Sequence, residues 1–445
     1  MNARYFATIL ALNLCLTANS KTWTLQQCLD YALEHNITIA KNRIAQEAGE
    51  STLSEYKSQL WPSLTFGTSQ NMTYRPLQKV ESVRSVDGEV TSSANKVTGS
   101  GSYNLSMNWM LWDGGVNRQN IKRQRIANRI AEQTTAVSEL NVQEQITQSY
   151  VQILYSKEAE SVNLRLAETA KAQWERGKEM QEQGQMSRAD VVQLEAQKAA
   201  ADYNVVQSRT QTANYKRQLK KLLQLDLSEE FDVDSPVPAD GAALDDIPTA
   251  QEVYAEAIAT RPEIRSAELN VEQADMQYDI ARRGHYPSIS LNAGVGDSHN
   301  SASQSSVGTQ LRANFAATAG LNISVPLWDQ RKTITAKEKA KQQKVTARLD
   351  LQDKKNDLSS TIEQYWLNAT NNQQRFVSAQ TKVESQTECY RLVDEQFKAG
   401  LKNVVDVLEA RDQMLSAEQD KLESKYNTIL NNALLKFYMG ENITL

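Results

Sequence analysis

The sequence predicts a mixed α+β membrane protein in which amphipathic strands pass directly into very long helices, and in which this plan occurs twice. Three observations predict this class. Landmarks of the first half of the 445-residue chain recur in the second half. In each half, alternating apolar and polar residues end at Leu-Trp-Asp, at 111–113 and 327–329. More than a hundred residues without a proline then follow each Leu-Trp-Asp.

The N-terminus predicts an export signal at residues 1–20. Arg4 precedes an apolar stretch from Tyr5 to Leu16, and Ala18-Asn19-Ser20 places small residues at −3 and −1 of a cleavage site. A buried N-terminal helix is the alternative. The remaining chain has no run of about 18 apolar residues, so no membrane-spanning helix is expected. At this point the exported chain is either soluble or enters a membrane as a β-barrel.

The chain is predicted to be a tandem duplication. At an offset of 225 residues, Trp61-Pro62 lies over Tyr286-Pro287. At an offset of 216 residues, Leu-Trp-Asp at 111–113 aligns with Leu-Trp-Asp at 327–329, and Gly184 aligns with Gly400. The sequence therefore predicts repeats at 21–225 and 249–440, with a short tail at 441–445.

Each repeat is predicted to open with a helix, at 24–60 and 249–284. Thr24 and Thr249 begin Thr-x-x-Gln and Thr-x-x-Glu patterns, which can cap the first free amides of a helix. Each helix is expected to end before the Trp-Pro or Tyr-Pro pair, because proline disfavours the α conformation in the preceding residue.

Two strands per repeat are predicted next, at 62–74 and 99–112, and at 286–296 and 311–328. Their alternation makes one face apolar and one polar, and a tilted membrane strand needs about 9–11 residues. The joining loops, 75–98 and 296–310, are long and polar. An interfacial aromatic girdle is expected at the opposite end of the strands, formed by Trp61, Trp112, Tyr286 and Trp328. The alternative is a soluble β-sandwich.

Long helices are predicted after the strands, at 114–183 and 330–399, with return helices at 187–225 and 403–440. Residues 116–183 contain one glycine, Gly177, and 330–399 contain none. At about 1.5 Å per residue, each first helix would be roughly 100 Å long. Apolar residues three to five or seven apart, among Gln, Asn, Lys and Glu, indicate a coiled-coil-like wall. Between the repeats, residues 226–248 contain eight acids and no base and are expected to form a linker on the outside of the assembly.

The composition argues against several classes of function. The net charge is −5 and no basic stripe is present, so no nucleic acid partner is expected. The three histidines lack further ligands at metal-binding spacing, and neither a nucleophile motif nor a phosphate-binding glycine loop occurs. We therefore expect no enzyme, no cofactor and no metal site. Cys28 and Cys389 stand far apart, and a bridge between them remains open.

The number of strands implies self-association. Known barrels begin at eight strands, so four strands per chain cannot close one. An open edge in lipid would leave backbone groups unpaired at several kcal/mol each. If the strands enter a membrane, other copies of the chain must complete the barrel.

These motifs resemble the TolC-like outer-membrane efflux proteins over nearly the whole mature chain. The resemblance rests on the order and duplication of Trp-Pro-Ser-Leu and Tyr-Pro-Ser-Ile, of Leu-Trp-Asp-Gly-Gly and Leu-Trp-Asp-Gln, and of the Gly-x5-Asp-Val turns at Gly184 and Gly400. It implies a homotrimer with a twelve-stranded transmembrane β-barrel in outer-membrane lipid and a long α-helical periplasmic tunnel. Its implied partners are a periplasmic adaptor protein and an inner-membrane pump of the RND, ABC or MFS type.

The resemblance also implies functional positions near the turns. Asp406 and Glu409 correspond to acids that ring the tunnel entrance, and their i, i+3 spacing places them on one helix face. Asp406 could equally cap its helix together with Asn403. In the first repeat Asp190 has only Gln193 after it, which favours a capping role. Phe397 and Lys402 stand where the family places an entrance latch, although Lys402 replaces an arginine and loses its bidentate fork.

Gly184 and Gly400 occupy turns that resemble adaptor contacts in the family. The structural alternative is that glycine is needed there only because the backbone of the turn has a positive φ. For the whole chain, the resemblance implies a passive export conduit of a tripartite efflux or type I secretion system. The competing hypothesis is a soluble exported coiled-coil scaffold or adaptor without transport activity.

Overall fold

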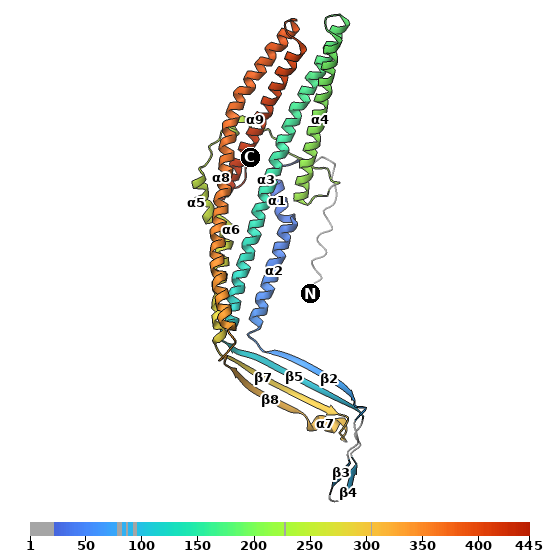
Figure 1. The fold of residues 1–445 in the computed structure, drawn as a ribbon, viewed down its shortest axis with the longest axis vertical. Coiled ribbons are helices and arrows are strands. Elements are labelled where there is room, and N and C mark those ends of the chain that lie inside the picture. The colour runs from blue at the N-terminus through green and yellow to red at the C-terminus, as the bar shows by residue number, and fades with distance from the viewer. Residues whose placement is uncertain (1–21, 78–81, 86–87, 92–95, 227, 304) are drawn as a thin grey trace, which may run out of the picture. The chain divides into compact units, whose positions relative to one another are not determined.

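The computed structural model describes residues 22–77, 82–85, 88–91, 96–226, 228–303 and 305–445 (Figure 1). The predicted signal peptide and parts of the first polar loop lie outside these residues. The chain divides into two compact units, Met1–Ile44 with Gln133–Arg265 and Gln352–Leu445, and Ala45–Glu132 with Ser266–Leu351. Each unit contains segments of both sequence repeats, so the compact units differ from the repeats.

A four-stranded antiparallel sheet forms the centre of the second unit. Its strands are β2 (Ser63–Tyr74), β5 (Val97–Asp113), β7 (Ser288–Asn300) and β8 (Ala316–Ser324). The strand order is β2-β5-β7-β8, so the two repeats join through the β5–β7 pair. Among the described strands, β2 and β8 each pair on one side only.

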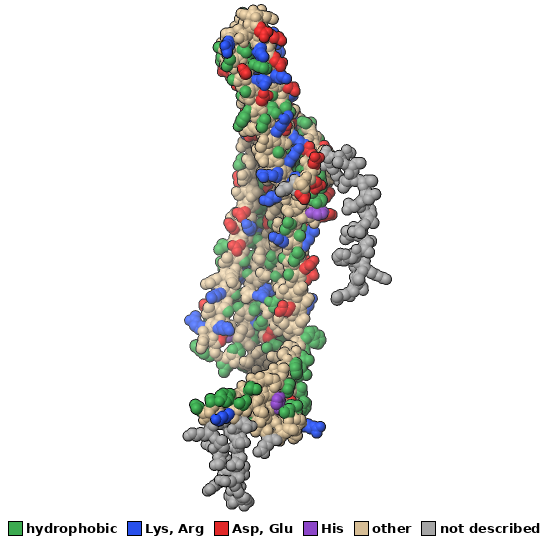
Figure 2. Space-filling model, turned by 90° about the vertical axis from the view of Figure 1, so that its right-hand side faces the viewer, with side chains coloured by type: hydrophobic (Ala, Val, Ile, Leu, Met, Phe, Trp, Pro, Cys, Tyr) green, Lys and Arg blue, Asp and Glu red, His purple; other side chains and the backbone are tan. Residues whose placement is uncertain are grey.

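The two faces of the sheet differ in polarity. Pairing places Phe66, Leu105, Val295 and Ala317 in one row across the four strands, and Leu64, Met107, Ala293 and Ala319 in the next such row. The rows between them carry small and polar residues, such as Thr65, Ser106, Gly294 and Thr318. Phe66 is 66% exposed and Leu321 59% exposed, so the apolar face is uncovered in this chain. Hydrophobic side chains gather over the sheet in Figure 2, whereas charged side chains are spread over the helices.

The last strand is shorter than the alternation of residues predicts. Residues 311–328 were expected to form one strand, but Leu311 to Ala313 belong to helix α7 (Val307–Ala313), which Ser306 caps. The strand ends at Ser324 because Pro326 has no amide proton to donate to a sheet ladder. By contrast, β7 extends to Asn300, beyond the expected end at residue 296, and its last four residues pair with β5. A short hairpin of β3 (Ser82–Ser85) and β4 (Gly88–Thr91) lies within the first polar loop.

The aspartate of each Leu-Trp-Asp caps the long helix that follows. Asp113 accepts hydrogen bonds from the amides of Gly115 (2.9 Å) and Asn117 (2.6 Å), at the start of α3 (Val116–Glu182). Asp329 accepts one from the amide of Thr333 (2.8 Å), at the start of α8 (Lys332–Lys398). The change of period at each Leu-Trp-Asp therefore marks a strand-to-helix junction with a built-in cap.

Both junctions use a left-handed backbone at two successive residues. Gly114 and Gly115 have φ values of 71° and 80°, and the matching residues Gln330 and Arg331 have φ values of 55° and 65°. A left-handed backbone costs a residue with a side chain about 1–2 kcal/mol. The second junction therefore keeps the geometry of the first at a cost in strain.

Helical hairpins dominate the first unit. Helix α3 returns through α4 (Arg188–Leu223), and α8 returns through α9 (Val404–Tyr438), as Figure 1 shows. Within the first unit the hairpins contact each other through tyrosines that donate to partly buried carboxylates of α3. Tyr365 and Tyr438 donate to the two oxygens of Glu144, and Tyr426 donates to Glu158 at 2.6 Å. Burial raises the pKa of all three tyrosines, so they remain donors.

The opening helix of each repeat is broken, contrary to the continuous helices expected at 24–60 and 249–284. In the first repeat, α1 (Leu25–His35) and α2 (Ile37–Ser58) are separated by Asn36, whose side chain accepts from the amide of Thr38. In the second, α5 (Ala250–Thr260) ends at Arg261 because Pro262 follows, and α6 (Pro262–Arg282) begins there. Arg261 is buried, with its guanidinium 4.0 Å from the ring centroid of Tyr438.

The acidic segment between the repeats belongs to the first unit and is packed against its helices. It contains β6 (Asp232–Val233), paired in parallel with β1 (Thr22–Trp23), and the 3₁₀ helix η1 (Asp240–Leu244). Val233 and Ala243 are fully buried. We call residues 231–246 the strap.

Two sequence questions have structural answers. Cys28 is buried and Cys389 exposed, and both are free thiols, so the possible bridge is absent. Among the described helices, none is long and apolar enough to cross a membrane.

Candidate functional site

The two hairpin tips have the same backbone turn. Gly184 and Gly400 have φ values of 73° and 77°. After each glycine, an amide reaches back five residues, from Gln185 to the carbonyl of Met180 (2.8 Å) and from Leu401 to that of Gln396 (2.9 Å). This pattern is a Schellman motif, which favours glycine at the left-handed position. The turn alone therefore accounts for both glycines.

The acidic candidates occupy different surroundings at the tips. Asp406 lies in a capping box, in which Asn403 Oδ1 accepts from the Asp406 amide (2.9 Å) and Asp406 Oδ2 accepts from the Asn403 amide (3.2 Å). At the start of α4, the Ser187 hydroxyl accepts from the Asp190 amide (3.2 Å) and donates to the Asp190 carboxylate (2.7 Å), so Asp190 is tied to this cap. Glu409 is exposed, and its hydrogen bond from Gln413 is long at 3.5 Å. Glu409 is thus the carboxylate of the three without a capping role.

The two latch candidates make different contacts. Lys402 Nζ lies 3.7 Å from Asp406 Oδ1, within its own tip, and this is its one ion pair among the described residues. Phe397 instead packs on a cluster built from both hairpins. The buried members of that cluster are Leu194, Val404 and Leu408, and Trp174 and Met186 flank it. In this structure the hairpins meet at the tip through apolar contacts.

Polar links between the hairpins were missed by reasoning from sequence. Gln173 of α3 donates to the hydroxyl of Tyr390 of α8 at 2.9 Å. Gln197 of α4 donates to the carboxylate of Asp412 of α9 at 3.3 Å. Arg411 is 4% exposed and donates to the same carboxylate at 2.9 Å. None of these residues belongs to a motif, and only their partners in space identify them.

The aromatic candidates gather at one end of the sheet in the second unit. Trp61 and Tyr286 stand two residues before β2 and β7. Trp112 is the next-to-last residue of β5, and Trp328 follows the end of β8. Because neighbouring strands are antiparallel, all four positions lie at the same end. Trp61 is 72% exposed and Trp328 82% exposed, so their rings are free to contact surroundings outside the chain.

Within the described part of the chain, no cluster of three His, Cys, Asp or Glu side chains could hold a metal ion. The chemistry that the tips offer is that of carboxylates, amides and an apolar contact.

Three curated relatives are 21–25% identical to this chain over the matched residues. It is 23% identical over 267 residues to the alkaline protease secretion protein AprF of Pseudomonas aeruginosa, a match that covers 58% of this chain and 53% of AprF. It is 25% identical over 252 residues to the outer membrane protein TolC of Escherichia coli, covering 54% of this chain and 47% of TolC. The chain thus spans about half the length of these two relatives. A match to the outer membrane efflux protein BepC of Brucella suis covers more, 80% of this chain and 75% of BepC, at 21% identity.

Solved channel structures share the fold along nearly the whole chain. CusC superposes with a TM-score of 0.79 at 14% identity, covering 97% of this chain and 96% of that structure. The Campylobacter jejuni outer membrane channel CmeC gives 0.75 at 19% identity, covering 97% and 92%. The Vibrio cholerae outer membrane protein VceC gives 0.74 at 15% identity, covering 94% and 97%. The fold is therefore TolC-like, mostly helical with sheets.

A family model described as outer membrane efflux protein matches residues 28–224 and 253–441. These two segments make up most of the chain and lie on either side of the strap. The chain belongs to the outer membrane efflux protein family.

Proposed function

We propose that this chain is the outer-membrane conduit of a tripartite efflux or type I secretion system. It acts as a homotrimer, in which three four-stranded sheets form one twelve-stranded barrel in the outer membrane. The long helices form a coiled-coil tunnel in the periplasm, and the conduit is passive, without catalytic chemistry. A periplasmic adaptor and an inner-membrane pump of the RND, ABC or MFS type are its proposed partners.

The observation that carries this proposal is the uncovered sheet. The rows of residues on one face of the sheet are apolar, and the side chains in them are exposed, with Leu64 at 68% and Phe66 at 66%. Its edge strands, 12 and 9 residues long, each leave one side without a described partner. Such a sheet is a liability in water. In lipid, the apolar face is solvated and pairing between copies satisfies both edges.

The aromatic residues support this placement. Trp61, Trp112, Tyr286 and Trp328 stand at the end of the sheet that leads into the helices. Trp and Tyr prefer the membrane interface, where the ring meets apolar chains and the polar atom meets water. We propose that these four rings mark the periplasmic surface of the outer membrane.

The tip carboxylates are proposed to line the entrance of the tunnel. Glu409 is the main candidate because it is exposed and has no capping role. Asp406 is the second, since its carboxylate holds a cap and also lies near Lys402. A homotrimer would gather six such carboxylates, and a ring of this kind favours cations. Asp190 is assigned to its cap, and the turns at Gly184 and Gly400 are proposed to contact the adaptor.

Phe397, rather than Lys402, is proposed to hold the entrance closed. Phe397 packs against residues of the other hairpin, whereas Lys402 pairs within its own tip. A latch of apolar contacts would respond weakly to salt, because screening acts on charges.

Envelope fractionation tests the membrane assignment. Washing with alkaline carbonate should leave the protein in the membrane fraction, and detergent should release it as a trimer, measured by light scattering. A soluble scaffold would leave with carbonate. Recovery of a folded monomer in detergent-free buffer would contradict both the barrel and the trimer.

Planar bilayer recordings test the entrance ring separately. Glu409→Gln should lower cation selectivity, and addition of Asp406→Asn should lower it further. Glu423→Gln is a matched control, because it removes a half-exposed carboxylate from the same helix well away from the tip. Unchanged reversal potentials in the double variant would refute the ring while leaving the conduit assignment intact.

A further inference from the structure

A cavity lies between the two hairpins near their tips. It has a volume of about 200 Å³ and is bounded by residues of α3, α4, α8 and α9, together with Met186 of the first turn. Its apolar lining consists of Met180, Met186, Leu194, Phe397, Val404 and Val407. An apolar protein cavity of about 150 Å³ is known to hold benzene. The space is thus sufficient for one substituted benzene ring.

The polar groups of the cavity come from one face of α8. Tyr390 and Asp394 are one helical turn apart and both line it. The Tyr390 hydroxyl accepts a hydrogen bond from Gln173, and its own proton is donated to none of the described residues. Asp394 accepts from Lys398 at 2.5 Å, which neutralises its charge. The cavity therefore presents an available hydroxyl donor beside a compensated carboxylate.

The rim gives access without a large rearrangement. Ala172, Arg176 and Lys398 line the cavity and are exposed, whereas Leu194, Val404 and Val407 at its apolar side are buried. Gly177 lies against this site, since a side chain there would come within 2.6 Å of Leu194 and 3.2 Å of Met186. The missing side chain at Gly177 lets α3 and α4 of the first hairpin pack this closely.

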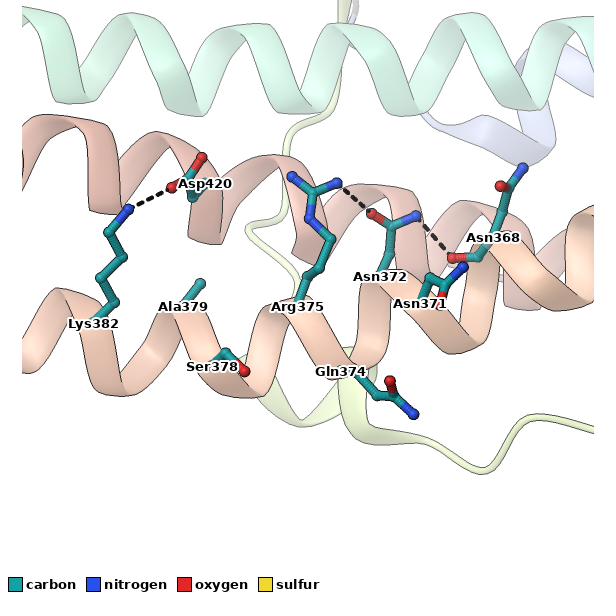
Figure 3. A pocket seen from close by; sticks show the side chains of 9 residues that line it. All are labelled: Asn368, Asn371, Asn372, Gln374, Arg375, Ser378, Ala379, Lys382 and Asp420. Carbon is teal, nitrogen blue, oxygen red and sulfur yellow. Dashed lines mark hydrogen bonds and ion pairs between the residues drawn. The ribbon is translucent and has the colours of Figure 1, made fainter.

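A larger groove on α8 lacks these properties. It is about 670 Å³ and is lined mainly by amide and charged side chains (Figure 3). Several of them satisfy one another: Arg375 donates to Asn372, and Lys382 pairs with Asp420 at 2.8 Å. This surface has no apolar wall against which a small molecule could exclude water.

We propose that the cavity between the hairpin tips binds a compact, uncharged aromatic molecule bearing a hydroxyl group, of the simple phenol class. The ring packs among Met180, Met186 and Phe397, where thioether sulfurs and an aromatic edge are favourable neighbours. The ligand oxygen accepts the proton of Tyr390 and offers its own proton to Asp394. The bound molecule touches both hairpins, so it resists their separation.

Methyl NMR of the detergent-solubilised full chain tests the site, with p-cresol as the probe. The protein carries ¹³C-labelled methionine methyl groups. Ring currents from a bound phenol should shift the Met180 and Met186 signals, and leave unchanged that of Met439, which follows α9 and does not line the cavity. For a ligand of this size we expect a Kd on the order of 1 mM. Absence of shifts at 5 mM p-cresol, or equal shifts for all methionines, would overturn the site.

A matched ligand pair tests the polar contact. p-Xylene has the shape of p-cresol but a methyl group in place of the hydroxyl. Each net hydrogen bond changes affinity by about 2- to 12-fold, and the p-cresol hydroxyl makes two, so p-cresol should bind more tightly than p-xylene by at least this factor. Tyr390→Phe removes the donor and leaves Asp394, so it should reduce this preference by about 2- to 12-fold without abolishing it. A preference of unchanged size in Tyr390→Phe would refute the assigned orientation.

Occlusion of the rim tests the location. Ala172→Phe places a ring at the exposed mouth without changing a buried residue, and should weaken p-cresol binding at least 10-fold. Ala196→Phe makes the same change at an exposed alanine of α4 outside the cavity and should bind as the unmodified protein does. Equal binding by both variants would place the ligand elsewhere.

Discussion

The strap is held to the helices by an ion pair whose removal has a calculable effect. Asp240 lies 2.7 Å from Lys421 and 3.1 Å from Lys425. Lys425 is 3% exposed, and its other acid, Glu158, is 4.0 Å away. Asp240→Asn would leave a buried ammonium with one distant partner. We expect this change to favour local opening of the strap.

The size of the effect follows from the surroundings of the pair. Breaking a fully buried ion pair costs about 3–5 kcal/mol. Here the side chain of Asp240 is 42% exposed and Glu158 remains, so we expect about 1–2 kcal/mol. Because 1.4 kcal/mol corresponds to a factor of ten, opening should increase about 5- to 30-fold. Adding Glu158→Gln removes the last acid and should increase it further.

Hydrogen exchange measured by mass spectrometry at neutral pH follows this opening in peptides that cover residues 236–247. Asp245→Asn is the matched control. It removes the same charge from the same segment, and its carboxylate has no ion-pair partner among the described residues. Faster exchange in both variants, or in neither, would refute the role assigned to the Asp240 pair.

Three further predictions concern the strap, the cysteines and the strand-to-helix junctions. Although burial opposes ionisation, hydrogen bonds from Lys157 and Lys216 lower the pKa of Asp232, and those from Lys421 and Lys425 lower that of Asp240. The two carboxylates therefore stabilise the packed strap at a pH above the ordinary carboxyl pKa of about 3.9, and this stabilisation is lost as the pH falls through their lowered pKa values. Hydrogen exchange in the strap, corrected for the intrinsic rate, should increase between about pH 5 and pH 3, before exchange in α4 does. An increase in both segments at the same pH would contradict this. Burial raises the pKa of Cys28 to about 12, so in the mature chain, which has lost Cys15 with the predicted signal, a thiol reagent at pH 8 should modify Cys389 alone, and Cys28 only after denaturation. Two reactive thiols in the native mature protein would be inconsistent with the buried site. Gly114→Ala should destabilise by about 1–2 kcal/mol, because its Cβ would lie 2.8 Å from that of Tyr286, whereas Gln330→Gly should be neutral or stabilising; thermal unfolding measures both, and equal losses would argue against strain at Gln330.

Local chemistry made the helix ends and strand starts predictable from sequence. Thr24 and Thr249 form the expected capping boxes with Gln27 and Glu252. Ser63 starts a strand directly after Trp61-Pro62, as the proline indicated. These features depend on contacts within a few residues, which sequence spacing displays directly.

Two prolines end elements inside patterns that continue past them. Pro262 ends α5 for the same steric reason that Pro62 ends the first opening helix, although the pattern over 249–284 predicts one continuous helix. Pro326 likewise ends β8 within a pattern that still alternates. Periodicity describes which face a residue takes, whereas a missing amide proton decides whether the ladder can continue.

The tip was only partly predictable, because its contacts join distant segments. The cap of Asp406 follows from Asn403 three residues earlier, and the structure has that box. By contrast, Gln173 and Tyr390 are hydrogen-bonded although 217 residues separate them in the sequence, and no motif marks the residues of the cavity beside them. The segment 226–248 was expected to be a linker on the outside of the assembly, because it holds eight acids, no base and three prolines and has little periodicity. Its fully buried Val233 and Ala243 are too few to give a periodic signal.

Neither repeat forms its sheet or its tip cluster alone, because each of these structures needs residues from both repeats. In the second unit, β5 of the first repeat needs β7 of the second, and without that pair each repeat would keep a two-stranded ribbon, which is marginal at best in water. In the first unit, Leu194 of one repeat is buried against Val404 and Leu408 of the other. The strap then contacts both hairpins, through Lys157 and Lys216 on one side and Lys421 and Lys425 on the other. The segment between the repeats thus joins their helices in space as well as along the chain. Cutting it between β6 and η1 should therefore weaken the pairing of the hairpins, although this cut leaves the four-stranded sheet and the long helices intact.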